Sequence, residues 1–211
     1  MTKDSSQPYP RTRRKRGSLT PDVILDAAET VAEQGFDAFS MRAVASRLGA
    51  VPMALYNHFA TKEQLVAALL DRVLGRFEPP APTDDWLEDL RAFARAHRQL
   101  LARHAWAVAP IFSNPSPGLS AVRIGELAMV TLKRGGLSDT EAVAAFSGLI
   151  ALNYGWASFT VERDLDVEAM LSALPAEVFP ITVATAAEWG AYGADEHYEF
   201  VLERYLKGLT L

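Results

Sequence analysis

The sequence predicts an all-α protein, in which a small three-helix domain with a helix-turn-helix precedes a larger helical domain. Apolar residues recur at intervals of three and four over most of the 211 residues, and no stretch alternates as a half-buried strand would. Capping residues and prolines indicate where helices begin, and glycines indicate where they end. The segment EPPAPTDD, residues 78–85, has three prolines in four positions and separates the two parts, because such a run cannot continue a helix.

The clearest local pattern is SMRAVASRLGAVPMALYNHFATK, residues 40–62. Ser40 can cap a first helix through its hydroxyl, and Gly49 can end that helix in a left-handed conformation. Pro52 suits the first position of a second short helix, because its φ is preset and its missing N–H is not needed there. Two short helices joined by a glycine turn predict a helix-turn-helix.

The second helix and the residues after it also carry a more specific motif. Leu55 and Phe59 share one face and are expected to be core residues, and Thr61 to Gln64 form a capping box that opens the next helix. The run resembles the signature of the tetracycline-repressor-like (TetR/AcrR) family of bacterial transcriptional regulators, a Leu-Tyr-x-His-Phe run followed by a lysine and an acid. The matching residues here are Leu55, Tyr56, Asn57, His58, Phe59, Lys62 and Glu63.

Charge is divided unevenly along the chain. The net charge is −5, but residues 1–77 have an excess of three basic side chains and residues 78–211 an excess of eight acidic ones. The basic excess therefore accompanies the helix-turn-helix, as a DNA-reading module requires. The run RTRRKR in residues 1–17 is either a solvated tail or an arm that follows phosphates or enters the minor groove, and we favour the arm, with Arg13, Arg14 and Arg16 as contacts.

The domain boundaries follow from these patterns. We expect a basic arm at 1–17, a DNA-binding domain at 18–64 and a larger helical domain at 65–211, to which the resemblance assigns ligand binding and dimerisation, with a helix at 62–77 connecting the last two. Besides the motif helices, we expect helices at 21–34, 85–103, 105–112, 119–134, 138–163 and 195–207, and shorter helical pieces at 169–174 and 180–189.

The resemblance implies how DNA is read. Tyr56, His58 and Lys62 look like phosphate contacts, and Ser40 and Arg42 would meet the backbone on the other side of the groove. Because residues 50–59 contain no Lys or Arg, the usual arginine-to-guanine contact is excluded in this helix. We therefore expect base contacts from Pro52, Met53 and Asn57, with apolar contacts to thymine methyl groups from Pro52, Met53 or Ala54 and polar readout from Asn57 and Arg42. Tyr56 and His58 could instead pack or cap.

In the resembled family the larger domain dimerises and encloses a small-molecule pocket. This implies a homodimer formed by the eighth and last helices, here 138–163 and 195–207, bound to a palindromic operator. The first of these helices has a stripe of small residues that would let another helix approach closely, although the approaching helix could belong to the same chain. The stripe consists of Ala144, Gly148, Ala151, Gly155 and Ser158.

The expected ligand is a small hydrophobic or amphipathic inducer. Two polar residues interrupt apolar helix faces, His97 in the helix at 85–103 and Asn153 in the helix at 138–163, and each is either a ligand contact or a satisfied core residue. With the surrounding apolar side chains they make a predicted pocket of Phe93, His97, Leu101, Trp106, Met129, Phe146, Leu149, Asn153 and Trp156.

Other functions remain open at this point, although the sequence supports them less. One alternative is an enzyme acting on a hydrophobic substrate. The sequence has no phosphate loop, no nucleophile elbow, no zinc signature and no cysteine, so we expect no catalysis, no cofactor and no metal. A second alternative is a purely structural helical dimer, which would leave the basic arm unexplained. A third is a transcriptional activator of the same fold instead of a repressor. The chain lacks an apolar leader and any cysteine, which favours a cytoplasmic protein without a membrane partner.

Overall fold

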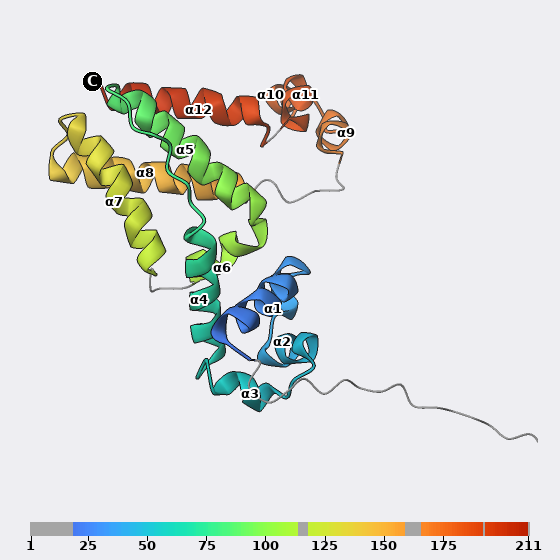
Figure 1. The fold of residues 1–211 in the computed structure, drawn as a ribbon. Helices are drawn as coiled ribbons and strands as arrows, with labels where there is room; N and C mark the ends of the chain where they lie inside the picture. The colour runs from blue at the N-terminus through green and yellow to red at the C-terminus, as the bar shows by residue number, and fades with distance from the viewer. Residues whose placement is uncertain (1–18, 114–117, 159–165, 192, 211) are drawn as a thin grey trace, which may run out of the picture. The chain divides into compact units, whose positions relative to one another are not determined.

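The computed structural model describes residues 19–113, 118–158, 166–191 and 193–210 (Figure 1). Within these ranges every regular element is helical, as the sequence predicts. The chain forms two compact units, one up to Leu69 and one from Leu70. The division falls inside helix α4 (Lys62–Leu74), five residues after the boundary expected at 64. The basic arm lies outside the described residues.

The first unit contains α1 (Pro21–Glu33), α2 (Met41–Leu48) and α3 (Pro52–Tyr56), as well as the first turns of α4. Side-chain caps begin the first two helices: Thr20 accepts from the N–H of Val23 at 3.3 Å, and Ser40 accepts from the N–H of Ala43 at 3.1 Å. Gly49 ends α2 with φ 63° and ψ 29°, the left-handed conformation that glycine adopts without a Cβ clash. Buried apolar side chains of all four helices, which include Ile24, Ala28, Val44, Leu55 and Leu65, form the core of this unit.

Helix α4 is shorter than the 62–77 that its apolar spacing predicts. It ends at Leu74, and Gly75, Arg76 and Phe77 continue as a turn in which the N–H of Arg76 donates to the carbonyl of Val73. Glycine is the least favourable ordinary residue inside a helix after proline, which explains the early end at Gly75.

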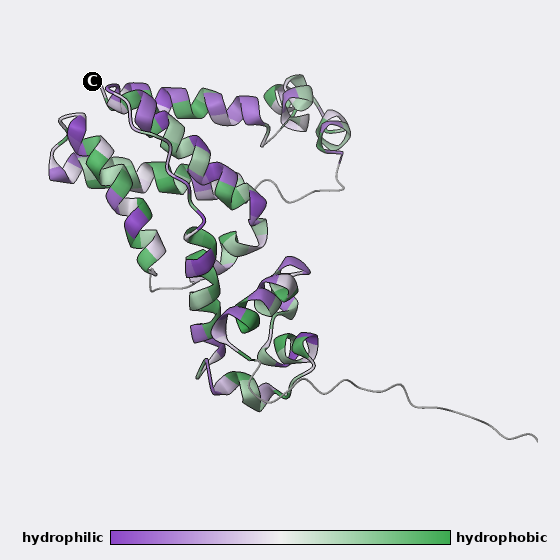
Figure 2. Cartoon of the chain, in the orientation of Figure 1, coloured by the Kyte–Doolittle hydropathy of each residue, from purple (hydrophilic) through white to green (hydrophobic). Residues whose placement is uncertain are grey.

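The second unit is built on four long helices: α5 (Trp86–Arg103), α7 (Leu119–Arg134), α8 (Asp139–Ala157) and α12 (Asp195–Gly208). Helix α8 packs against α5 and α7, and α5 also contacts α7 and α12. Figure 2 shows hydrophilic and hydrophobic residues on different sides of α5 and α12, as expected for helices with one buried face. The core between these helices includes Leu90, Ala94, Leu132, Leu149 and Leu202.

Shorter helices complete the second unit. The helix expected at 105–112 is a 3₁₀ turn at Ala105–Ala107 followed by α6 (Val108–Ser113). Helix α9 is Val167–Ser172, and the piece expected at 180–189 is divided at Thr185 into α10 (Pro180–Ala184) and α11 (Ala186–Gly190). Helix α8 was expected to reach Arg163, but it ends at Ala157, and residues 159–165 lie outside the described ranges.

Three ion pairs align α5 with α12 along their length. In each pair an arginine of α5 contacts a carboxylate of α12 at 2.5–2.6 Å, and the partner numbers fall as the arginine numbers rise, so the two helices run antiparallel. The pairs are Arg91–Glu203, Arg95–Glu199 and Arg98–Asp195.

Candidate DNA-binding surface and ligand cavity

Helix α3 divides its side chains between core and solvent as the motif predicts. Leu55 has no exposed surface, and Phe59, just beyond the helix, is only 8% exposed. The residues assigned to DNA contacts on this helix and just after it are all exposed: Pro52, Met53, Tyr56, Asn57 and His58. Because Leu55 and Phe59 fix the helix to the unit beneath it, the opposite face is available to another molecule.

The flanking contacts predicted for phosphates come from the starts of α2 and α4. Arg42 and Lys62 are exposed, whereas Ser40 is half-buried and its hydroxyl already accepts the hydrogen bond that caps α2. The hydroxyl of Thr61 accepts from the N–H of Gln64 at 3.2 Å, and the Gln64 side chain accepts from the N–H of Ala60 at 2.9 Å. Lys62 therefore stands at a fixed helix N-terminus, where free N–H groups and the helix dipole favour an anion.

Two apolar residues at the start of α3 are exposed. Val51 is 66% exposed and Met53 is 70% exposed, so these two side chains contribute little to the core. Apolar side chains that stand free beside polar Asn57 fit a surface that meets thymine methyl groups as well as base edges.

In the second unit, His97 and Asn153 belong to one buried hydrogen-bond network. Asn153 has no exposed surface, and its Nδ2 donates to the carbonyl of Ala94 at 3.0 Å and lies 3.1 Å from Nδ1 of His97. Its Oδ1 accepts from the hydroxyl of Tyr198 in α12 at 2.8 Å. Burial lowers the pKa of His97 to about 4, so its imidazole is neutral at physiological pH.

A cavity of about 340 Å³ lies beside this network. Its walls come from the end of α4 and from α5, α7 and α8, and they are almost entirely apolar, which is the usual character of a small-molecule site. The lining residues are Leu74, His97, Ala121, Val122, Ile124, Gly125, Phe146, Ile150 and Tyr154.

Two of the nine predicted pocket residues, His97 and Phe146, line this cavity. Phe93, Leu101 and Leu149 are core residues with at most 4% exposure, and Met129 packs against the same core. Trp156 donates from Nε1 to the carbonyl of Gly193 at 3.1 Å and stacks edge-on against Tyr198, and Trp106 is half-buried away from the lining. Asn153 does not line the cavity, but it contacts His97, which does.

Most residues that line this cavity are not among those predicted from the sequence. Phe146, Ile150 and Tyr154 follow one another at intervals of four on α8, so helical periodicity could have identified this wall. The wall from α7, which includes Ile124 and Gly125, carries no comparable signal, because it depends on which helices become neighbours.

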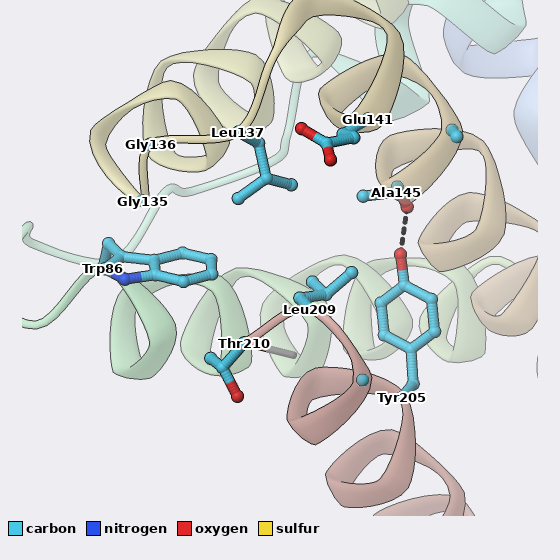
Figure 3. A pocket seen from close by; sticks show the side chains of 11 residues that line it. Trp86, Gly135, Gly136, Leu137, Glu141, Ala145, Tyr205, Leu209 and Thr210 are labelled. Carbon is cyan, nitrogen blue, oxygen red and sulfur yellow. Dashed lines mark hydrogen bonds between the residues drawn. The ribbon is translucent and has the colours of Figure 1, made fainter.

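A second, more open hollow of about 730 Å³ lies where the turn between α7 and α8 meets the end of α12 (Figure 3). Its polar side chains are already engaged: Glu141 accepts from the N–H and hydroxyl of Ser138, and the Tyr205 hydroxyl donates to the carbonyl of Ala145. Trp86 covers the end of α7 at Gly135, where a Cβ would lie 2.5 Å from the indole ring. This hollow is therefore a less suitable ligand site than the smaller cavity.

Replacing Gly135 by alanine is expected to lower the free energy of unfolding by about 1–3 kcal/mol, because the new methyl group must displace the Trp86 ring. The backbone at Gly135, with φ −72° and ψ −3°, suits alanine, so the cost is steric. The matched control is Gly208→Ala in α12, where nothing lies within 4 Å of the added Cβ. Urea denaturation followed by tryptophan fluorescence measures both, and equal stabilities of the two variants would contradict the close packing of Trp86.

Within the described ranges, no helix is both long enough and apolar enough to span a lipid bilayer.

Comparison with known proteins agrees with this architecture. Residues 24–69 match the family of bacterial regulatory proteins called the tetR family, and residues 78–211 match the tetracyclin repressor-like C-terminal domain. The HTH-type transcriptional repressor DrrR1 of Streptomyces coeruleorubidus is 29% identical over 95% of this chain and 80% of its own. The tetracycline repressor protein class A from transposon 1721 of Escherichia coli is 32% identical over 72% of this chain and 68% of its own.

Among solved structures, the TetR family protein ActR of Streptomyces coelicolor in complex with actinorhodin superposes with a TM-score of 0.79. It is 26% identical, and the match covers 90% of this chain and 96% of ActR. Both domains are thus matched by family models, and relatives span nearly the whole chain. The chain belongs to the tetR family of bacterial regulatory proteins.

Proposed function

We propose that this protein is a transcriptional repressor that binds a palindromic operator as a homodimer and is released from it by a small hydrophobic molecule. The observation that carries the proposal is the exposed face of α3, held in place by the buried Leu55 and flanked by the capped starts of α2 and α4. The relatives named as transcriptional repressors support the same conclusion.

The DNA contacts divide by chemistry. Met53 and Pro52 would meet thymine methyl groups, and Asn57 can form a two-point contact with adenine. Tyr56, His58, Arg42 and Lys62 would hold phosphates, which fixes the register of α3 on the duplex without reading sequence. Ser40, already used as a cap, would contribute by orienting α2, and the arm residues Arg13, Arg14 and Arg16 would add contacts along the backbone or in the minor groove.

Dimerisation through α8 and α12 is supported by the apolar side chains that these helices expose. Val143 is 55% exposed on α8, and Phe200 and Val201 are 61% and 38% exposed on α12. On α8, Ala144 and Ala151 of the small-residue stripe are also exposed, whereas a Cβ on Gly148 would lie 3.1 Å from Tyr205 of the same chain. The small-residue stripe thus packs against α12 of the same chain at Gly148, while Ala144 and Ala151 remain accessible to a partner subunit.

The cavity beside His97 is the proposed effector site. Its apolar walls suit a hydrophobic molecule, and the structurally similar ActR has been solved in complex with actinorhodin. A ligand can release the operator only to the extent that it binds the DNA-incompetent conformation more tightly than the competent one.

The test is selection of bound sequences from a random duplex pool by the full-length protein at two salt concentrations. A palindromic consensus whose affinity falls as salt rises is expected, because phosphate contacts release counterions. Retention of DNA without any enriched sequence would contradict the proposal of a specific operator.

Lysine and asparagine substitutions should separate phosphate contacts from base contacts. Lys62→Ala is expected to weaken binding to every sequence and to reduce the slope of log K against log salt by about 2 for a dimer, one phosphate per subunit. Asn57→Ala is expected to cost about 1–3 kcal/mol per half-site on the operator alone and to leave the salt slope unchanged. Fluorescence anisotropy on operator and scrambled duplexes measures both, and identical behaviour of the two variants would refute the division of roles.

A further inference from the structure

The effector cavity has a single nitrogen-containing side chain among its lining residues, and that side chain is His97. The imidazole is only 1% exposed, so what surface it has is available to the cavity that it lines. The state of its two ring nitrogens therefore determines what His97 can offer a ligand, beside the hydroxyl of Tyr154, which also belongs to the lining.

The orientation of the Asn153 amide follows from its neighbours. The carbonyl of Ala94 can only accept, so the atom of Asn153 that lies 3.0 Å from it must be the donor Nδ2. The Oδ1 atom then faces α12 and accepts from the Tyr198 hydroxyl at 2.8 Å. The amide is thus fixed from both sides.

This orientation determines the tautomer of His97. The second proton of Asn153 Nδ2 faces Nδ1 of His97 at 3.1 Å, so Nδ1 must be the acceptor and the ring proton must be on Nε2. Within the described part of the chain, Nε2 makes no hydrogen bond, and it is not among the fully buried polar atoms. It is a donor without a protein partner at the edge of an apolar cavity.

Aromatic neighbours hold the ring in this position. Phe93 stacks on it with the ring centres 6.1 Å apart, while Phe77 and Tyr154 meet it edge-on at 6.1 and 5.5 Å. A donor so fixed loses little freedom on binding, which favours selectivity for a ligand that places an acceptor opposite it.

We infer that His97 recognises, through its Nε2–H, an acceptor oxygen on an otherwise apolar effector, and that Asn153 and Tyr198 are positioning residues for this donor. The inference rests on the proposed function, because it assigns the effector class of the same cavity. Effectors that present a donor or a cation at this point are disfavoured, since they would shield the Nε2–H from water without offering it an acceptor.

The ligand test uses three tricyclic probes of nearly equal size with the full-length protein. Fluorenone offers a ketone, fluorene offers no polar group, and carbazole offers an N–H donor. Isothermal titration should show fluorenone binding about fivefold more tightly than fluorene, the effect of one neutral hydrogen bond, with carbazole weakest. In His97→Phe, which keeps a ring but has no donor, the preference for fluorenone should disappear.

A second measurement needs no probe. In protein labelled with ¹⁵N-histidine, multiple-bond proton–nitrogen correlations should report a protonated Nε2 and an unprotonated Nδ1 for His97. In Asn153→Leu both tautomers should be populated and the preference for fluorenone reduced, a change that loss of packing alone would not produce. In Tyr198→Phe the tautomer should persist, because the Ala94 carbonyl still fixes the amide.

A proton on Nδ1 in the wild-type protein would overturn the inference, and this result does not depend on whether any variant folds. Equal affinities for fluorenone and fluorene, or no binding of any probe, would overturn it as well. Operator binding is measured separately in the same preparation. If the protein binds its operator but none of the probes, the effector assignment is wrong and the repressor proposal stands. If no operator is found, the repressor proposal is wrong whether or not the probes bind.

Discussion

Leu55→Ala is expected to lower the free energy of unfolding by about 2–5 kcal/mol and to abolish operator binding. Leu55 has no exposed surface and is the buried anchor of α3, a helix of only five residues. Because such a short helix has almost no stability of its own, its orientation depends on the packing of Leu55 in the core. Thermal and urea denaturation measure the first effect, and anisotropy on the selected operator measures the second.

Met53→Ala on the same helix is the matched control. Its side chain is 70% exposed, so we expect a stability change within about 0.5 kcal/mol but a clear loss of operator affinity, because the apolar contact with DNA is removed. If Met53→Ala were as destabilising as Leu55→Ala, the division of α3 into a core face and a reading face would be wrong.

Asn153→Leu is expected to lower the free energy of unfolding by about 2–4 kcal/mol, although leucine has the same side-chain branching and is more hydrophobic. The loss arises because the Tyr198 hydroxyl and the His97 Nδ1 atom would stay buried without a partner. Tyr198→Phe alone should cost about 1–3 kcal/mol, because it leaves the Oδ1 atom of Asn153 buried without the Tyr198 hydroxyl, while Nδ2 keeps the Ala94 carbonyl and His97 Nδ1 as partners.

The double variant Asn153→Leu/Tyr198→Phe completes a double-mutant cycle that measures the coupling between these two residues. It has no unpaired hydroxyl, so it should be more stable than the sum of the single effects predicts, by about 1–2 kcal/mol. Additive effects would mean that the Tyr198–Asn153 hydrogen bond contributes nothing beyond packing. Guanidinium denaturation of the four proteins gives the coupling energy directly.

Local signals in the sequence were sufficient for most helix boundaries. The cap at Ser40 and the glycine at Gly49 define α2 as predicted, and the helix expected at 119–134 is α7 (Leu119–Arg134). The piece at 180–189 was expected as one helix, but it is interrupted at Thr185, whose φ of −108° and ψ of 13° lie outside the helical region. The Thr185 hydroxyl donates to the carbonyl of Ile181, but Thr131 and Ser147 make the same kind of bond inside the unbroken helices α7 and α8, so this bond does not explain the interruption.

The ligand site was harder to predict, because it depends on which helices become neighbours. His97 and Asn153 were both recognised as polar residues on apolar faces, but their different roles depend on Tyr198, which is 45 residues from Asn153 in sequence. The DNA-binding residues, by contrast, lie within one short motif, so their exposure could be predicted from helical period. Their individual contacts with bases and phosphates stay predictions.

The ion pairs between α5 and α12 do not by themselves specify the register of these two helices. Arginines and acids recur at nearly the same intervals on both helices, so sliding α12 by one turn, about 5.4 Å, would still oppose two of the three pairs. The buried hydrogen bond from Tyr198 to Asn153 has no equivalent in a shifted arrangement. This bond, together with the Tyr205 hydroxyl that donates to the carbonyl of Ala145 in α8, thus selects one alignment among several that charge alone would tolerate.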